Sequence, residues 1–188
     1  MGLRDALFGK KKLSEPKEDR LFALSTAAVT LSVELGLTPA GVAAIAFKPQ
    51  SSGEFRSAFD DVDELVEAVA KQSGSTVERK SDQYGFDWLI IHDPDLEDLV
   101  TTIHTVASEL TAKGFGPQLL AAVFRFSGGE HPVYWVYGFK RGAFWPFVPA
   151  GDQKRDNATE LELKAKLENE LPIEPDLTRW LALFDAPL

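Results

Sequence analysis

The segment that decides the fold is residues 119–148, LLAAVFRFSGGEHPVYWVYGFKRGAFWPFV. It contains three apolar runs rich in aromatic residues, at 119–126, 133–140 and 143–148, which are typical of β-strands. Parallel strands need a connection of a dozen or more residues, and the links here are much shorter, so the three strands must be antiparallel neighbours. Pro146 has no N–H to donate, which places the last strand at a sheet edge or across a bulge.

Two amphipathic helices are predicted before this meander. Residues 59–71 place apolar side chains on one face; Asp61 and Glu64 have the spacing of a capping box, and Gly74 is the expected stop. The second helix is expected to begin with Asp93 as N-cap and Pro94 at the first helical position, and to end near Gly114.

The remaining strand candidates form two pairs. Residues 29–33 alternate apolar and polar side chains and are expected to form a hairpin with 42–47, and residues 75–80 are expected to pair with 86–92. After the meander, the sequence predicts a charged helix from Asn157 to Leu171 and a short helix that starts at Asp176. The predicted class is α+β: a mostly antiparallel sheet of about six to seven strands with helices packed on one face, in which strand–strand–helix units precede the three-stranded meander and the C-terminal helices.

Composition excludes several classes of protein. The 188 residues include no cysteine, so a disulfide framework, a thiolate nucleophile and a Cys-ligated metal are ruled out. A net charge of −9 argues against a nucleic-acid binder, because contacts to phosphates need clustered Lys and Arg. The charge is polarised: residues 1–12 carry a net +3, which leaves −12 for the rest of the chain. We therefore expect a cytoplasmic protein, with residues 1–16 as a basic amphipathic segment and linker, and 17–188 as one α+β domain.

The basic head has a direct functional interpretation. As a helix it would place Leu3, Leu7 and Phe8 on one face, with cationic side chains available for anionic headgroups. This pattern predicts reversible contact with the inner face of the membrane, although the same face can dock on a protein helix, and a solubilising terminus is the alternative. The residues predicted to make membrane or partner contact are Leu3, Arg4, Leu7, Phe8, Lys10, Lys11 and Lys12.

The meander supplies a second candidate surface. Alternation puts Trp135, Tyr137 and Phe139 on one face of their strand and Tyr134 on the other, so both faces of the meander are partly apolar. One face is expected to pack under the helices, and the other to form a partner site unless the C-terminal segment covers it. The candidate partner residues are Tyr134, Trp135, Tyr137 and Trp145.

Catalytic and metal motifs are not found in the sequence. The three histidines lack paired ligand spacing, and the acidic clusters at 60–64 and 93–98 are best explained as helix-capping or solvated carboxylates. Gly9-Lys10 lacks the glycine that a phosphate-binding loop requires upstream, and no nucleophile motif is present. We therefore predict no catalytic residues, no metal and no cofactor, and a protein that is not an enzyme.

Three segments resemble the bacterial PspA-associated protein PspAB family. They are MGLRDALFGKKKL at 1–13, DRLFALSTAAVTL at 19–31, and GVAAIAFKP at 41–49. The family is named for genes that lie beside phage-shock protein A, the peripheral membrane protein of envelope-stress responses. The resemblance implies an accessory role at the cytoplasmic face of the membrane and a protein partner of the PspA type, and it implies no reaction.

These observations favour a non-enzymatic adaptor of a phage-shock-type envelope-stress response. The main alternative is a secretion-chaperone-like module that holds a client on an exposed sheet face. A hydrolase or ligand-binding domain built on scattered carboxylates is a third hypothesis. The sequence leaves the oligomeric state open.

Overall fold

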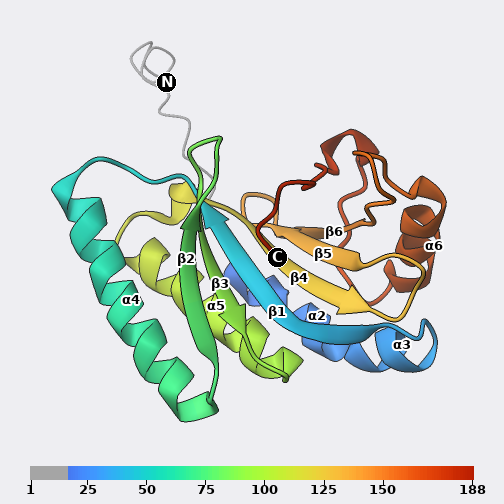
Figure 1. The fold of residues 1–188 in the computed structure, drawn as a ribbon, viewed down its shortest axis with the longest axis horizontal. Helices are drawn as coiled ribbons and strands as arrows, with labels where there is room; N and C mark the ends of the chain where they lie inside the picture. The colour runs from blue at the N-terminus through green and yellow to red at the C-terminus, as the bar shows by residue number, and fades with distance from the viewer. Residues whose placement is uncertain (1–16) are drawn as a thin grey trace, which may run out of the picture.

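The computed structural model describes residues 17–188 and shows an α+β fold built on one open antiparallel sheet of six strands (Figure 1). The strand order is β2-β3-β1-β4-β5-β6, and every neighbouring pair is antiparallel. The strands are β1 (Thr38–Phe47), β2 (Thr76–Ser81), β3 (Asp87–His92), β4 (Leu119–Ser127), β5 (Val133–Gly138) and β6 (Ala143–Phe147). The predicted class and the C-terminal meander β4-β5-β6 are therefore confirmed. Pro146 lies in β6, at the edge of the sheet, as its missing N–H requires.

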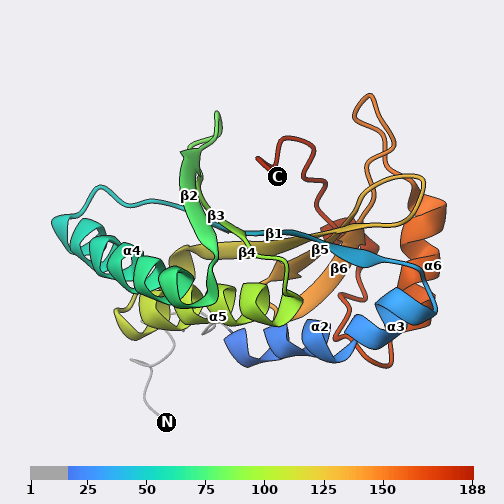
Figure 2. The same cartoon turned by 60° about the horizontal axis from the view of Figure 1, so that its bottom comes forward.

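Helices α2 to α5 lie on one side of this sheet (Figure 2). They are α2 (Ala23–Thr26), α3 (Ala28–Val33), α4 (Gly53–Ser73) and α5 (Leu96–Ala112), while α6 (Asn157–Leu167) stands beside the β6 end. Short 3-10 helices η1 (Glu18–Phe22), η2 (Gly116–Gln118) and η3 (Leu177–Arg179) complete the elements. The largest buried cluster lies between the sheet and these helices and includes leucines of α6, so the main core is on the helix side.

The prediction of a strand at residues 29–33 is wrong, because this segment forms helix α3. Leu31 is fully buried, whereas Val29 and Val33 are 71% and 78% exposed, so the alternating pattern does not mark a buried strand face. The predicted hairpin of 29–33 with 42–47 does not form. In its place β1 is the central strand, paired with β3 on one side and β4 on the other.

The helix boundaries correct four further expectations. Helix α4 begins at Gly53 with Ser52 as N-cap, so Asp61 and Glu64 lie inside the helix and make no capping box, although Gly74 ends it as predicted. Helix α5 is capped by Asp95 rather than Asp93. Helix α6 is capped by Asp156 and ends at Leu167. The helix predicted from Asp176 is a single 3-10 turn.

The acidic run 93–98 has a structural role in this arrangement. The buried Asp93 carboxylate accepts hydrogen bonds from the Asp95 backbone N–H at 2.8 Å and from the Ser75 hydroxyl, and Asp95 in turn caps α5. The carboxylates of Asp93 and Asp95 accept hydrogen bonds from backbone N–H groups at and just before the start of α5, which agrees with the capping explanation offered by the sequence.

Candidate functional site: an apolar groove on the helix-free sheet face

The two faces of the sheet are both apolar, but they are covered differently. The face opposite α2–α5 carries a second buried cluster, separate from the main core. Its strand residues are Val42, Ala44, Ala46, Trp88, Ile90, Val123, Val136, Trp145 and Phe147. The cover on this face comes from the end of the chain, with Trp180, Leu183 and Phe184 packed on the strands. Figure 2 shows the chain end on this side of the sheet.

This cover is incomplete and leaves a groove of about 480 Å³. The groove volume is within the range of 300–1,000 Å³ that is usual for ligand pockets in proteins. Its lining is apolar apart from Lys140, at the turn between β5 and β6. The lining residues are Ala46, Phe86, Trp88, Gly116, Pro117, Leu119, Leu120, Ala121, Lys140, Trp145, Leu181 and Leu183. Such a lining favours an apolar side-chain surface or hydrocarbon over a polar metabolite, because few groups are available to hydrogen-bond a ligand.

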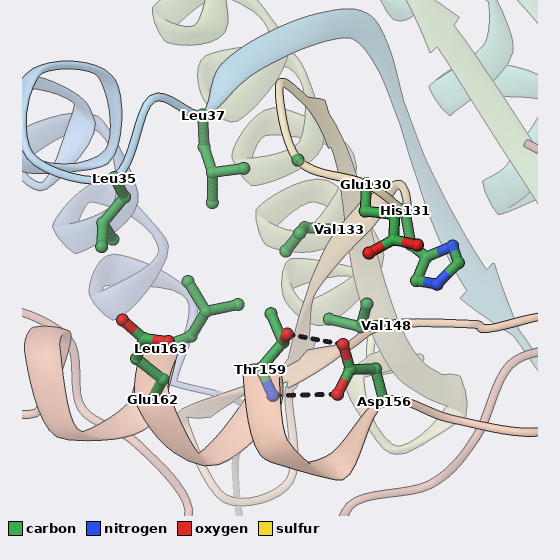
Figure 3. A pocket seen from close by; sticks show the side chains of 11 residues that line it. Leu35, Leu37, Glu130, His131, Val133, Val148, Asp156, Thr159, Glu162 and Leu163 are labelled. Carbon is green, nitrogen blue, oxygen red and sulfur yellow. Dashed lines mark hydrogen bonds between the residues drawn. The ribbon is translucent and has the colours of Figure 1, made fainter.

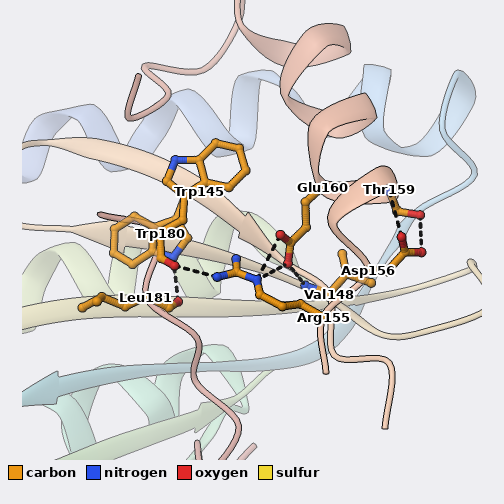
Figure 4. Close-up of polar contacts among 8 residues, drawn as sticks. All are labelled: Trp145, Val148, Arg155, Asp156, Thr159, Glu160, Trp180 and Leu181. Atoms are coloured by element: carbon orange, nitrogen blue, oxygen red, sulfur yellow. Dashed lines mark hydrogen bonds and ion pairs between the residues drawn. The ribbon is translucent and has the colours of Figure 1, made fainter. Parts of the chain in front are cut away.

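One wall of the groove is the segment 180–188, which we call the C-terminal strap. Figure 4 shows how it is held at its start. The Arg155 guanidinium donates to the Trp180 carbonyl at 2.6 Å and to both carboxylate oxygens of Glu160 at 3.0 and 3.1 Å. The Trp145 indole N–H donates to the Leu181 carbonyl at 3.1 Å. A charge-assisted network therefore holds the start of the strap on the sheet, next to its groove-lining residues Leu181 and Leu183.

The other end of the strap contacts the β2–β3 hairpin. The Tyr84 hydroxyl donates to the Asp185 carboxylate at 3.0 Å, which joins residues 101 apart in the sequence across the groove side of the sheet. The hydrogen bond to Asp185 raises the pKa of Tyr84 above its ordinary value, because the bond is lost when the phenol ionises. Tyr84 is 62% exposed, so this contact is a surface clasp rather than part of the core.

Asp82 orders the hairpin turn beside the groove. Partial burial acts to raise the pKa of this carboxyl, but hydrogen bonds from the Trp88 indole and from the backbone N–H groups of Phe86, Tyr84 and Gly85 outweigh it, so the pKa of Asp82 lies below its usual value. The ionised Asp82 therefore holds Trp88 in the orientation in which it lines the groove.

The structure separates the four aromatic residues that the sequence proposed for a partner face. Tyr134 and Trp145 lie on the helix-free face; Tyr134 is partly exposed and Trp145 lines the groove. The assignment of Trp135 and Tyr137 to a partner face is wrong, because both side chains are fully buried on the helix side. Burial also raises the pKa of Tyr137, whose hydroxyl donates to the Lys17 carbonyl.

The family model described as PspAB, PspA associated protein B, matches residues 1–188, which is the whole chain. The chain belongs to the PspA associated protein B family. No curated protein and no solved structure matches it. The resemblance to the PspAB family that was drawn from residues 1–13, 19–31 and 41–49 is thereby confirmed, and the family's description names an association with PspA.

The basic head of this PspAB family member lies outside the described residues. Leu3, Arg4, Leu7, Phe8, Lys10, Lys11 and Lys12 therefore stay predictions. The described chain begins at Lys17, whose N–H donates to the Phe139 carbonyl at 3.4 Å. Lys17 therefore lies at the β5–β6 turn, to which Lys140 of the groove belongs. Within residues 17–188, no helix combines the length and the apolar character needed to cross a bilayer.

A second, smaller pocket lies between α6 and the β4–β5 turn (Figure 3). It encloses about 170 Å³ over an apolar floor that includes Leu37, Val133 and Leu163, with Glu130, His131 and Glu162 at its rim. The carboxylate of Asp156 caps α6, accepting from the Thr159 hydroxyl at 2.6 Å and the Thr159 N–H at 3.0 Å, and these bonds lower the pKa of Asp156. The pocket is smaller than usual ligand sites, and among residues 17–188 no cluster of His and carboxylates suited to a metal occurs there or elsewhere.

Sequence reasoning located the helix-free face but missed the parts that shape its groove. The sequence predicts a short helix from Asp176 and names the C-terminal segment as a cover for this face, but no motif in it singles out Arg155 as the residue that holds the segment. A signal was present: residues 177–188 contain Leu177, Trp180, Leu181, Leu183 and Phe184, too many apolar side chains for a solvated tail.

Proposed function

We propose that this PspAB family member is a non-enzymatic adaptor of a phage-shock-type envelope-stress response. In this proposal it acts in the cytoplasm and binds a protein partner of the PspA type through the groove on its helix-free sheet face. The observation that carries the proposal is the groove itself, which is apolar, has a volume of about 480 Å³ and lies between Trp88, Trp145 and the C-terminal strap. The family name supports the choice of partner.

The chemistry of the groove indicates what such a partner would present. Leu120 and Leu181 line the groove and remain 38% and 62% exposed, so each has apolar surface left to bury against an occupant. An amphipathic helix of the partner would supply a matching stripe of apolar side chains. Lys140 at the rim would then favour an acidic residue on that helix.

The test is binding of a purified PspA-type protein to the variant L120S/L181S. The two leucines together expose roughly the surface of one whole side chain, so their loss should cost about 1.5–3 kcal/mol, which is tenfold to a hundredfold in Kd. The matched control is L161S/L177S, whose leucines are 47% and 49% exposed and do not line the groove. Absence of binding by the wild-type chain, or equal loss in both variants, would contradict the proposal.

A second part of the proposed function is reversible contact of residues 1–12 with the membrane surface. Three apolar side chains and four cations suit a shallow, reversible anchor. The full chain with L3S/L7S/F8S should pellet less than wild type with vesicles containing phosphatidylserine. Equal pelleting of the two proteins would contradict this part, and leave the groove proposal to its own test.

A further inference from the structure

Four basic residues of the folded domain meet at the β5–β6 turn. Lys140 and Arg141 belong to the turn, and Lys17 and Arg20 of the incoming chain lie against it. The backbone of Lys17 is bonded to the Phe139 carbonyl, and the Arg20 guanidinium donates to the Gly142 carbonyl at 3.3 Å. All four residues are exposed. We call this group of four residues the basic turn.

Gly142 permits this close packing. Its φ is +65°, and a Cβ there would lie 2.8 and 2.9 Å from the Cβ and Cδ of Lys17 and 3.3 Å from Arg20. A larger residue would push the incoming chain away from the turn. The glycine therefore brings the cations of two segments, more than 100 residues apart in sequence, into one patch.

Three acidic side chains, Glu18, Asp19 and Glu174, lie near the patch, and they offset its charge to different degrees. Glu18 accepts a hydrogen bond from Thr111 of α5, and Asp19 lies 3.4 Å from His104 with its side chain fully exposed. Glu174 lies 3.4 Å from Arg141 but is 3% exposed. Glu174 thus offsets Arg141, and the outward charge of the basic turn is that of Lys17, Arg20 and Lys140 less the exposed Asp19, on a body whose overall charge is strongly negative.

We infer that the basic turn is a docking site for an anionic phospholipid bilayer. Each Lys or Arg near such a surface contributes about 1 kcal/mol, and the patch adds its cations to the four in the sequence of residues 1–12. The acidic remainder of the body is then held away from the lipid by its own repulsion, which sets the orientation of the molecule. Lys140 also lines the groove, so one end of the groove lies at the membrane surface.

This inference rests on the membrane part of the proposed function and extends it to named residues of the folded domain. It differs in what it predicts, because charge removed at the turn must weaken binding even when residues 1–12 are intact. A protein that bound lipid by its head alone would be insensitive to Lys17 and Lys140.

The test measures partition of the full-length variant K17Q/K140Q onto vesicles of phosphatidylcholine with phosphatidylserine, at about 0.1 M salt. Two cations at about 1 kcal/mol each predict binding about 25-fold weaker than wild type. The control K71Q/K166Q removes the same charge from the ends of α4 and α6, and should change binding less than threefold.

Each outcome decides the inference. A selective loss in K17Q/K140Q supports it, and equal losses in both variants would show that net charge alone matters and overturn it. If K17Q/K140Q binds vesicles as well as wild type and L3S/L7S/F8S binds them less well, residues 1–12 alone are the anchor and the inference about the basic turn is wrong. If only K17Q/K140Q binds less well, the inference about the basic turn is supported and residues 1–12 are not the anchor. If no protein binds vesicles, or if the turn instead captures a soluble acidic protein, the assignment to lipid is wrong.

Discussion

Replacing Arg155 with methionine should be among the most damaging single changes outside the main core. Glu160 is buried, at 2% exposure, and its carboxylate is satisfied by Arg155 and by the Val148 N–H at 2.8 Å. Arg155→Met leaves that charge buried with one remaining donor, and it also frees the Trp180 carbonyl that the guanidinium holds. Removing one partner of a buried pair typically costs 3–5 kcal/mol, so we expect the free energy of unfolding to fall by about 3–5 kcal/mol.

The assay is urea unfolding followed by tryptophan fluorescence, since Trp145 and Trp180 lie at the network. The double variant R155M/E160Q removes the buried charge yet keeps an acceptor for the Val148 N–H, and should regain at least about 1 kcal/mol over R155M. The control is R179M, because Arg179 pairs with Asp176 at the surface and its loss should cost less than about 1 kcal/mol. The reasoning is refuted if R155M costs no more than R179M, or if R155M/E160Q is as unstable as R155M.

Three further predictions concern the groove side and the turns. Gly128→Ala should destabilise by about 1–3 kcal/mol or more, because φ is +125° and the new Cβ would lie 2.0 Å from the Gly36 carbonyl oxygen; Gly129→Ala, with its nearest contact at 3.5 Å, is the control in thermal unfolding. Asp185→Asn should lower the pKa of Tyr84 toward its ordinary value, as seen in a phenol absorbance titration, and should speed hydrogen exchange in residues 182–188; an unchanged titration would mean that the clasp is absent in solution. The pKa of Asp82 is lower in the folded chain than its ordinary value of 3.8, so the ionised carboxylate stabilises the fold above pH 3.8, and this stabilisation is lost as the pH falls through the folded-state pKa. Asp82→Asn should therefore make the free energy of unfolding depend less on pH on the acid side. The same acid-side pH dependence in the variant and the wild type would contradict this.

The sequence predicted best where local signals were strong and agreed with one another. The meander had three apolar runs and links too short for any other pairing, and Pro146 marked the sheet edge correctly. Helix α5 followed a continuous apolar stripe. Alternation along β5 also divided Trp135 from Tyr134 correctly, because side-chain direction in a strand is fixed by the backbone alone.

Prediction failed where a short pattern fitted two structures. The alternation of Val29, Leu31 and Val33 is typical of a strand, but in α3 Leu31 alone reaches the core and the two valines face solvent. The N-cap of α5 was predicted wrongly for a related reason. Asp93 and Asp95 are two residues apart and both suit an N-cap, and the choice between them depends on Ser75, which approaches Asp93 from the segment before β2.

By itself, the sequence determined the class of fold, the three-stranded meander, the two apolar faces of the sheet and the contrast between a basic head and an acidic body. These properties follow from residue order, since strand and helix periodicity and net charge require no knowledge of distant neighbours. The tertiary structure alone decided that the C-terminal strap covers the helix-free face only in part, that Arg155 and Glu160 hold it there, and that Lys17 lies at the turn that contains Lys140. Each of these depends on contacts between segments far apart in the chain, where a side chain's role is set by what packs against it.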